Sequence, residues 1–149
     1  MKRILGLAVA ISAVAVVPAI AQVCTNATTA GMTPGQIKTL VVTKYACVGT
    51  FPNAQWNELH NSSTASGNVL DYKLGPTSPT DPSDTPAHPT GQFAISAPNG
   101  AQAPGLITYT YGANSYTYYV VNNLTPPRYS FCGTGAAPQL AVTISATHC

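Results

Sequence analysis

Residues 106–121 read LITYTYGANSYTYYVV and give the strongest structural signal in the chain. Ile, Tyr and Val alternate with Thr and other residues in two runs, and the four residues 112–115 (GANS) separate the runs. Alternation with a period of two, broken by turn-forming residues, is typical of a β-hairpin. We therefore expect two antiparallel strands here, with tyrosines on both faces.

Tyrosine is concentrated in this hairpin, with five of the eight tyrosines falling between positions 109 and 119. Packing within the sheet explains most of them, because aromatic pairs add about 0.5–1.5 kcal/mol beyond area burial. The remainder could form a binding face for a hydrophobic small molecule, a glycan or a partner sheet, since small β-barrels often bind ligands in apolar clefts. The candidate aromatic binding face consists of Tyr109, Tyr111, Tyr116 and Tyr118.

Residues 1–21 have the pattern of an export signal. Lys2 and Arg3 precede an apolar run at 4–17, and small residues lead up to Ala21. This order of charge, apolar run and small-residue end is typical of a cleaved secretory signal peptide. The apolar run is shorter than the roughly 20 residues that a membrane span requires. We expect cleavage after Ala21 and a periplasmic or extracellular protein with no membrane span.

Residues 22–149 are then expected to form a single domain. Val23 directly precedes Cys24, where a lipoprotein anchor would need a small residue, so the pattern indicates secretion and not lipid attachment. About 128 of the 149 residues would remain, enough for one hydrophobic core.

Few charges remain in this mature chain, and the two signs balance. Its charged residues are Lys38, Lys44, Lys73 and Arg128 against Glu58, Asp71, Asp81 and Asp84. With no basic cluster, the sequence offers no electrostatic basis for binding nucleic acid.

Four cysteines in an exported chain predict two disulfides, and none has the CxxC spacing of a zinc or redox site. Cys47 and Cys132 lie in apolar, strand-like surroundings, whereas Cys24 and Cys149 lie at the two ends of the mature chain. The economical pairing joins Cys47 to Cys132 and Cys24 to Cys149. Pairing Cys24 with Cys47 and Cys132 with Cys149 is the alternative.

The rest of the chain predicts one short helix and several more strands. Thr33 and Gln36 form a Thr-x-x-Gln capping box with proline between them, so a helix of at most two turns is expected from there. Further strands are expected at 44–48, 56–60, 69–74, 92–97, 128–132 and 140–145. Short strands joined by turns predict a mainly β fold. We expect a small antiparallel meander barrel, or a two-sheet sandwich, of seven to eight strands.

Residues 75–91 read GPTSPTDPSDTPAHPTG and contain five prolines. Prolines at such intervals exclude a helix or a central strand. We interpret the segment as a stiff connection over the surface of the domain, with a proline-rich ligand for another protein as the alternative.

The mature chain resembles a family of small exported bacterial proteins of uncharacterised function. The resemblance rests on a short hydrophobic helix leading to a Thr-x-x-x-Cys strand at Cys47, and on the motifs Trp-x-Glu-x-His at 56–60, Leu-Asp-Tyr-Lys-x-Gly-Pro at 70–76 and Tyr-Ser-Phe-Cys-Gly at 129–133. It implies that Cys47 and Cys132 occur together, which favours their pairing, and it implies no activity. Cys24 and Cys149 depart from the family pattern as an extra terminal pair.

Glu58 and His60 are the most suggestive pair of polar residues. Two positions apart on a strand, their side chains point the same way, so an acid–base pair or a metal site is geometrically possible. The simpler interpretation is a cross-strand polar network that fixes strand register. We expect the network, because no metal-ligand motif such as HExxH is present. The candidate polar cluster consists of Trp56, Glu58, His60, Asp71, Tyr72 and Lys73.

No motif in the chain identifies a catalytic residue, a metal site or a cofactor. The GxSxG elbow of serine hydrolases and the phosphate loop of nucleotide-binding proteins are both missing from the sequence. We expect an exported, non-enzymatic β-domain that acts as a binding or envelope-associated structural module. Its partner would be a small molecule, a glycan or an envelope protein. The alternatives are a carrier of small hydrophobic ligands and a metal-assisted or acid–base enzyme using Glu58 and His60.

Overall fold

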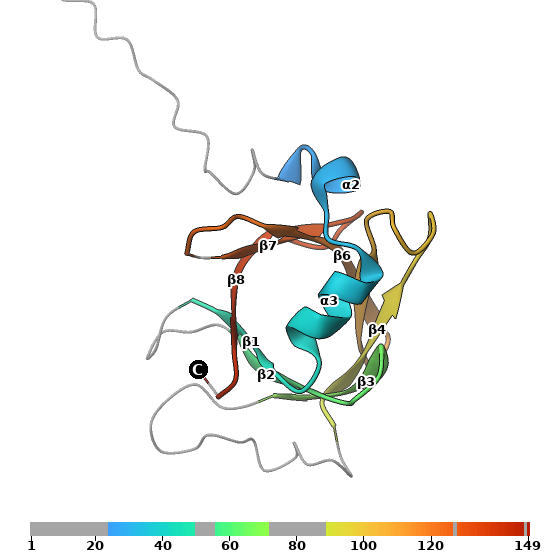
Figure 1. The fold of residues 1–149 in the computed structure, drawn as a ribbon. Coiled ribbons are helices and arrows are strands. Elements are labelled where there is room, and N and C mark those ends of the chain that lie inside the picture. Colours follow the sequence, from blue (N-terminus) through green and yellow to red (C-terminus); the bar gives the residue numbers. More distant parts are fainter. Residues whose placement is uncertain (1–23, 50–55, 72–88, 127, 148) are drawn as a thin grey trace, which may run out of the picture.

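The structure, a computed structural model of the 149-residue chain, describes residues 24–49, 56–71, 89–126, 128–147 and 149. The described strands form a closed antiparallel barrel in which each strand pairs with its neighbours in sequence and the last pairs with the first (Figure 1). The strands are β1 (Tyr45–Val48), β2 (Trp56–Asn61), β3 (Ser66–Asp71), β4 (Gly91–Ser96), β5 (Leu106–Tyr111), β6 (Asn114–Asn122), β7 (Tyr129–Gly133) and β8 (Leu140–Ser145).

The barrel confirms the predicted fold class and decides between barrel and sandwich. β8 pairs with β1 in antiparallel register, with Tyr45 opposite Ser145 and Val48 opposite Val142. Closure leaves none of the eight described strands with an edge free to pair with another chain.

The predicted hairpin is present as β5 and β6, joined by a tighter turn than expected. Tyr111 lies opposite Asn114, so only Gly112 and Ala113 form the turn. Gly112 has a φ of 58°, a conformation that favours glycine. Thr108 and Thr117 pair on the outer face, where their hydroxyl oxygens lie 2.9 Å apart.

The inner face of the barrel is largely filled with apolar and aromatic side chains. The largest fully buried aromatic residues, each at most 2% exposed, come from β4, β5, β6 and β7: Phe93, Tyr109, Tyr118 and Phe131. An eight-stranded barrel has an interior just wide enough for its own side chains or for one small ligand. Here the side chains occupy much of it.

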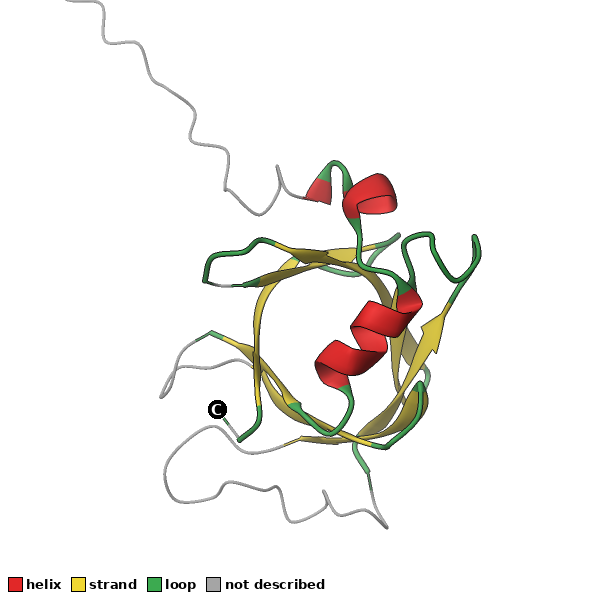
Figure 2. Ribbon diagram, in the orientation of Figure 1, coloured by secondary structure: helices red, strands yellow, loops and turns green. Residues whose placement is uncertain are grey.

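The helix α3 (Pro34–Val41) lies across one end of the barrel (Figure 2). It begins with the predicted capping box: the Thr33 N–H donates to Gln36 Oε1 at 2.8 Å, and the Gln36 N–H donates to Thr33 Oγ1 at 3.4 Å. The buried side chains of the helix join the barrel core and are Ile37, Leu40 and Val41. The chain then enters β1 through Thr43, whose φ is 59°.

A second helix, α2 (Ala27–Ala30), precedes α3 and was not among the predicted elements. Ala27 is buried in a small cluster with Val121 and Cys132, and Tyr119 packs against that cluster. Because Val121 and Cys132 point away from the barrel interior, α2 covers part of the outer surface of β6 and β7.

The polar loop between β2 and β3 is shorter than expected, so β3 begins at Ser66 and not near Val69. Ser62 Oγ and Thr64 Oγ1 both donate to the Ser66 carbonyl, at 2.6 and 2.7 Å. Hydroxyl side chains that bond nearby backbone groups in this way stabilise tight loops.

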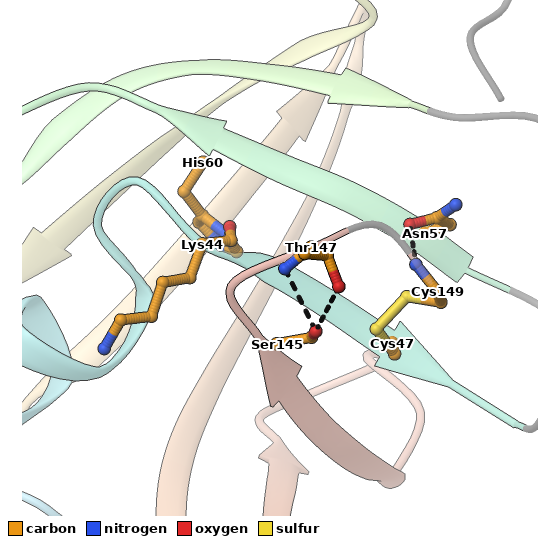
Figure 3. Close-up of a disulfide and its surroundings, with 7 residues drawn as sticks. All are labelled: Lys44, Cys47, Asn57, His60, Ser145, Thr147 and Cys149. Carbon is orange, nitrogen blue, oxygen red and sulfur yellow. Dashed lines mark hydrogen bonds between the residues drawn. A yellow bond between two sulfur atoms is a disulfide. The ribbon is translucent and has the colours of Figure 1, made fainter.

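Both predicted disulfide pairings are wrong. The structure joins Cys24 to Cys132, with a Cα–Cα distance of 5.3 Å, and Cys47 to Cys149, with 5.9 Å. Each bridge connects a strand to the first or the last residue that the structure describes. Figure 3 shows the second bridge, beside which the Cys149 N–H donates to Asn57 Oδ1 at 2.9 Å.

The barrel closure explains why Cys47 and Cys132 do not pair. They lie on β1 and β7, and β8 runs between these two strands. Adjacent strands are about 4.8 Å apart, so two strand spacings alone separate the two Cα atoms by about 10 Å, beyond the roughly 6.8 Å limit of a disulfide. The registers separate them further, because Cys47 lies opposite Thr143 on β8 whereas Phe131, next to Cys132, lies opposite Leu140. Their apolar neighbours Ala46, Val48 and Phe131 face the core, whereas both cysteines lie on the outer face.

Several predictions fall wholly or partly outside the described residues. These include the signal peptide at 1–21 and most of the proline-rich segment at 75–91, of which only residues 89–91 are described. None of the helices in the described ranges has the length and apolar character needed to cross a membrane.

Candidate binding site at one end of the barrel

The barrel end opposite α3 contains a pocket of about 510 Å³. α3 leads into the start of β1, whereas the pocket lies where β3 and β5 end and β6 begins, so the two features occupy opposite ends of the barrel. We call this site the tyrosine–acid pocket. Its lining residues are Glu58, Asp71, Thr90, Tyr111, Asn114, Tyr116, Tyr118 and Pro138.

Two carboxylates lie side by side in the wall of this pocket. Glu58 on β2 is directly opposite Asp71 on β3, so both side chains point to the same face of the sheet. Directly opposite residues have Cβ atoms about 4.5–5.5 Å apart. Glu58 is only 6% exposed, and Asp71 is half-buried. The pair gives this end of the barrel an acidic character.

Tyr111 is held against Glu58. Its hydroxyl oxygen lies 2.8 Å from both Glu58 Oε1 and Glu58 Oε2, so its single proton is shared between two acceptors. Burial, the negative charge of Glu58 and this hydrogen bond all raise the pKa of Tyr111 far above its usual range. Tyr111 therefore remains a neutral donor that orients the Glu58 carboxylate.

Tyr118 lines the same pocket as Tyr111 and Glu58, but unlike Tyr111 its hydroxyl makes no hydrogen bond to a described residue. Its side chain is 0% exposed, and its hydroxyl has no hydrogen-bond partner in the described part of the protein. Burial, with smaller contributions from Glu58 and Tyr116, raises its pKa to about 12, so the hydroxyl is protonated at neutral pH. A buried polar group left without a partner costs about 1–3 kcal/mol. Tyr118, which lines the pocket, thus carries a donor and acceptor group that the described residues do not satisfy.

Aromatic rings lie around and below the two carboxylates. The Tyr111 and Tyr116 ring centroids are 6.2 Å apart, and the Tyr109 ring is 6.4 Å from Tyr111 and 6.0 Å from Tyr118. Phe131 adds a further ring, 5.8 Å from Tyr118. The site is therefore an acidic pocket on an aromatic base.

His60 lies deeper in the barrel and does not line the pocket. Its Nδ1 is 3.1 Å from the Lys44 carbonyl oxygen, and its Nε2 is 2.7 Å from the Tyr109 hydroxyl. A carbonyl only accepts, so Nδ1 carries the proton and Nε2 accepts from Tyr109. Burial lowers the pKa of His60 to about 4, and the ring is neutral at pH 7. Both ring nitrogens are engaged in the fold, which favours a structural role for His60.

The structure brings together part of the candidate polar cluster. Glu58 and Asp71 share the pocket wall, whereas His60 lies opposite Val69 in the core. Tyr72, Lys73 and the side chain of Trp56 lie outside the described part of the structure. The described residues contain no group of three or more His, Cys, Asp or Glu side chains that could hold a metal ion.

All four tyrosines of the candidate aromatic face lie on the inner side of the barrel. Tyr111, Tyr116 and Tyr118 line the pocket, whereas Tyr109 is 1% exposed and belongs to the core. Sequence reasoning missed Thr90, Asn114 and Pro138, which lie just before or at the start of strands at this end of the barrel. Only the strand order identifies them, because no local motif marks these residues.

Comparisons of the chain with family models, with curated proteins and with solved structures find no match. The resemblance to a family of exported bacterial proteins therefore stays a prediction.

Proposed function

We propose that the protein is an exported, non-enzymatic binding domain that takes a small ligand into the tyrosine–acid pocket. The observation that supports this most directly is the Tyr118 hydroxyl, which is fully buried, lines the pocket and has no partner in the described protein. A ligand group placed against this hydroxyl would satisfy it. The pocket volume of about 510 Å³ lies within the range of small-molecule sites.

Other features agree with this proposal. Two disulfides favour an oxidising compartment, as expected for an exported protein. The barrel interior below the pocket is filled by Phe93, Tyr109 and Phe131, which leaves little room for a ligand enclosed at the centre. This argues against a carrier that surrounds a hydrophobic ligand and for a site at the barrel end.

The proposal can be tested by two-dimensional NMR on the oxidised mature protein, residues 22–149. The probes are a neutral phenol, benzoate, benzylammonium and a methyl glucoside, each titrated to about 10 mM, since a Kd of 1 mM corresponds to only about −4.1 kcal/mol. At least one probe is expected to shift the amide signals of Glu58, Tyr111 and Tyr118 while leaving that of Ile37 in α3 unchanged.

Tyr118→Phe should weaken the binding of that probe at least threefold. Tyr119→Phe on the outer face of the same strand is the matched control and should leave it unchanged. If none of the four probes shifts the pocket signals, the proposed function is wrong.

A further inference from the structure

We propose that the ligand of the tyrosine–acid pocket is an organic cation, specifically a primary ammonium group carried on an aromatic or aliphatic body. This inference rests on the proposed function and identifies the class of its ligand. Three observations support it: the charge of the pocket wall, its aromatic surroundings and the buried Tyr118 hydroxyl.

The charge of the wall selects a cation over an anion. Glu58 and Asp71 both line the pocket, so two carboxylates stand in its wall. Because Glu58 is almost fully buried, its charge acts largely through protein, where electrostatic interactions are stronger than in water. An anionic ligand would be repelled by both carboxylates.

The tyrosine rings favour an organic cation over a metal ion. A cation within about 6 Å of a ring centroid is attracted to the face of an aromatic ring, and ammonium groups are recognised in this way. Tyr111, Tyr116 and Tyr118 supply three such rings in one pocket. A metal ion would need more ligands than the two carboxylates, because the raised pKa values of Tyr111 and Tyr118 keep both phenols protonated and the described residues contain no group of three or more His, Cys, Asp or Glu side chains that could hold one.

The Tyr118 hydroxyl favours a primary ammonium over a quaternary one. A protonated phenol can accept a hydrogen bond through its lone pairs, and –NH₃⁺ offers three donors. A single ammonium group could therefore direct one N–H at Tyr118 Oη and the other two at the Glu58 and Asp71 carboxylates. A trimethylammonium group has no N–H and would leave Tyr118 without a partner.

The test is isothermal titration calorimetry of the oxidised mature protein with four related compounds. These are 2-phenylethylammonium, its neutral analogue 2-phenylethanol, its trimethylated analogue and 3-phenylpropanoate. The primary ammonium is expected to bind at least tenfold tighter than the alcohol and at least threefold tighter than the trimethylated compound. No binding of 3-phenylpropanoate is expected.

Two variants locate the charge that the ligand recognises. Glu58→Gln keeps an acceptor for Tyr111, and Asp71→Asn changes the more exposed member of the pair. Each should weaken binding of the ammonium at least fivefold while leaving the affinity for 2-phenylethanol within twofold. Tyr119→Phe again serves as the control. If either variant fails to fold, the other variant and the four-compound series still decide the question.

The outcomes separate this inference from the proposed function. Equal affinity for the ammonium and the alcohol, or unchanged ammonium binding in both carboxylate variants, would show that the ligand is not selected by charge. The pocket would remain a binding site in that case if the alcohol shifts its NMR signals. If none of the four compounds binds, the ammonium proposal is wrong, and the function then depends on the phenol, benzoate and glucoside probes.

Discussion

Removing the hydroxyl of Tyr118 should affect stability in the opposite direction from removing that of Tyr109. Tyr118 Oη is buried without a partner in the described protein, whereas Tyr109 donates to His60 Nε2 at 2.7 Å. Phenylalanine retains the ring contacts of Tyr118 with Tyr109 and Phe131, at 6.0 and 5.8 Å. Tyr118→Phe therefore removes only a polar group that is expensive to bury.

The expected magnitudes follow from the state of each hydroxyl. Tyr118→Phe should leave the free energy of unfolding unchanged or raise it by up to about 2 kcal/mol, because a buried unsatisfied group costs about 1–3 kcal/mol. Tyr109→Phe should lower it by about 1–3 kcal/mol, because it leaves His60 Nε2 buried without a donor.

Urea unfolding followed by circular dichroism measures both effects. With an m-value of about 2 kcal/mol/M, a change of 1 kcal/mol moves the midpoint by about 0.5 M. Tyr119→Phe controls for loss of a phenol outside the pocket. A loss of more than about 1 kcal/mol in Tyr118→Phe, comparable to that in Tyr109→Phe, would refute the claim that the Tyr118 hydroxyl is unsatisfied.

Three further predictions concern the scaffold. Folding lowers the pKa of His60 from 6.5 to about 4, so between these pH values the unfolded chain binds a proton that the folded chain does not, and the free energy of unfolding decreases as pH falls. Urea unfolding should show a decrease of about 2 kcal/mol from this group between pH 7 and pH 5, and His60→Gln should lack this part of the pH dependence. Thr33→Ala should lower stability by about 1 kcal/mol through loss of the helix cap, whereas Thr39→Ala on the exposed side of α3 should have a smaller effect; equal effects would contradict the capping role. Replacing Cys47 and Cys149 together by alanine should lower stability by about 4–5 kcal/mol, because their bridge closes a loop with a sequence separation of 102; a loss below about 1 kcal/mol would contradict that estimate.

Local patterns were enough to predict α3 and most of the strands of this barrel, though not α2 or the start of β3. Alternation along residues 106–121 predicted the hairpin because each inward side chain of a strand is followed by an outward one. The Thr33 and Gln36 pair predicted the start of α3 because a capping box is satisfied within four residues. Such signals involve neighbours in sequence, so they need no knowledge of the tertiary structure.

The disulfides and the pocket depend on contacts between residues far apart in sequence. Glu58 and His60 were predicted to share a face, and they do, but their partners Tyr111 and Tyr109 lie 53 and 49 residues away. The pairing of Cys47 required knowing that β8 separates β1 from β7. Neither fact can be read from a local pattern.

A crystal structure of oxidised residues 22–149 with 2-phenylethylammonium bound would test the central claim most directly. The proposed site predicts the ammonium nitrogen within about 3.2 Å of Tyr118 Oη and facing the carboxylates of Glu58 and Asp71. A ligand bound elsewhere on the barrel, with the Tyr118 hydroxyl making no contact to it, would contradict the assignment of the tyrosine–acid pocket as the binding site.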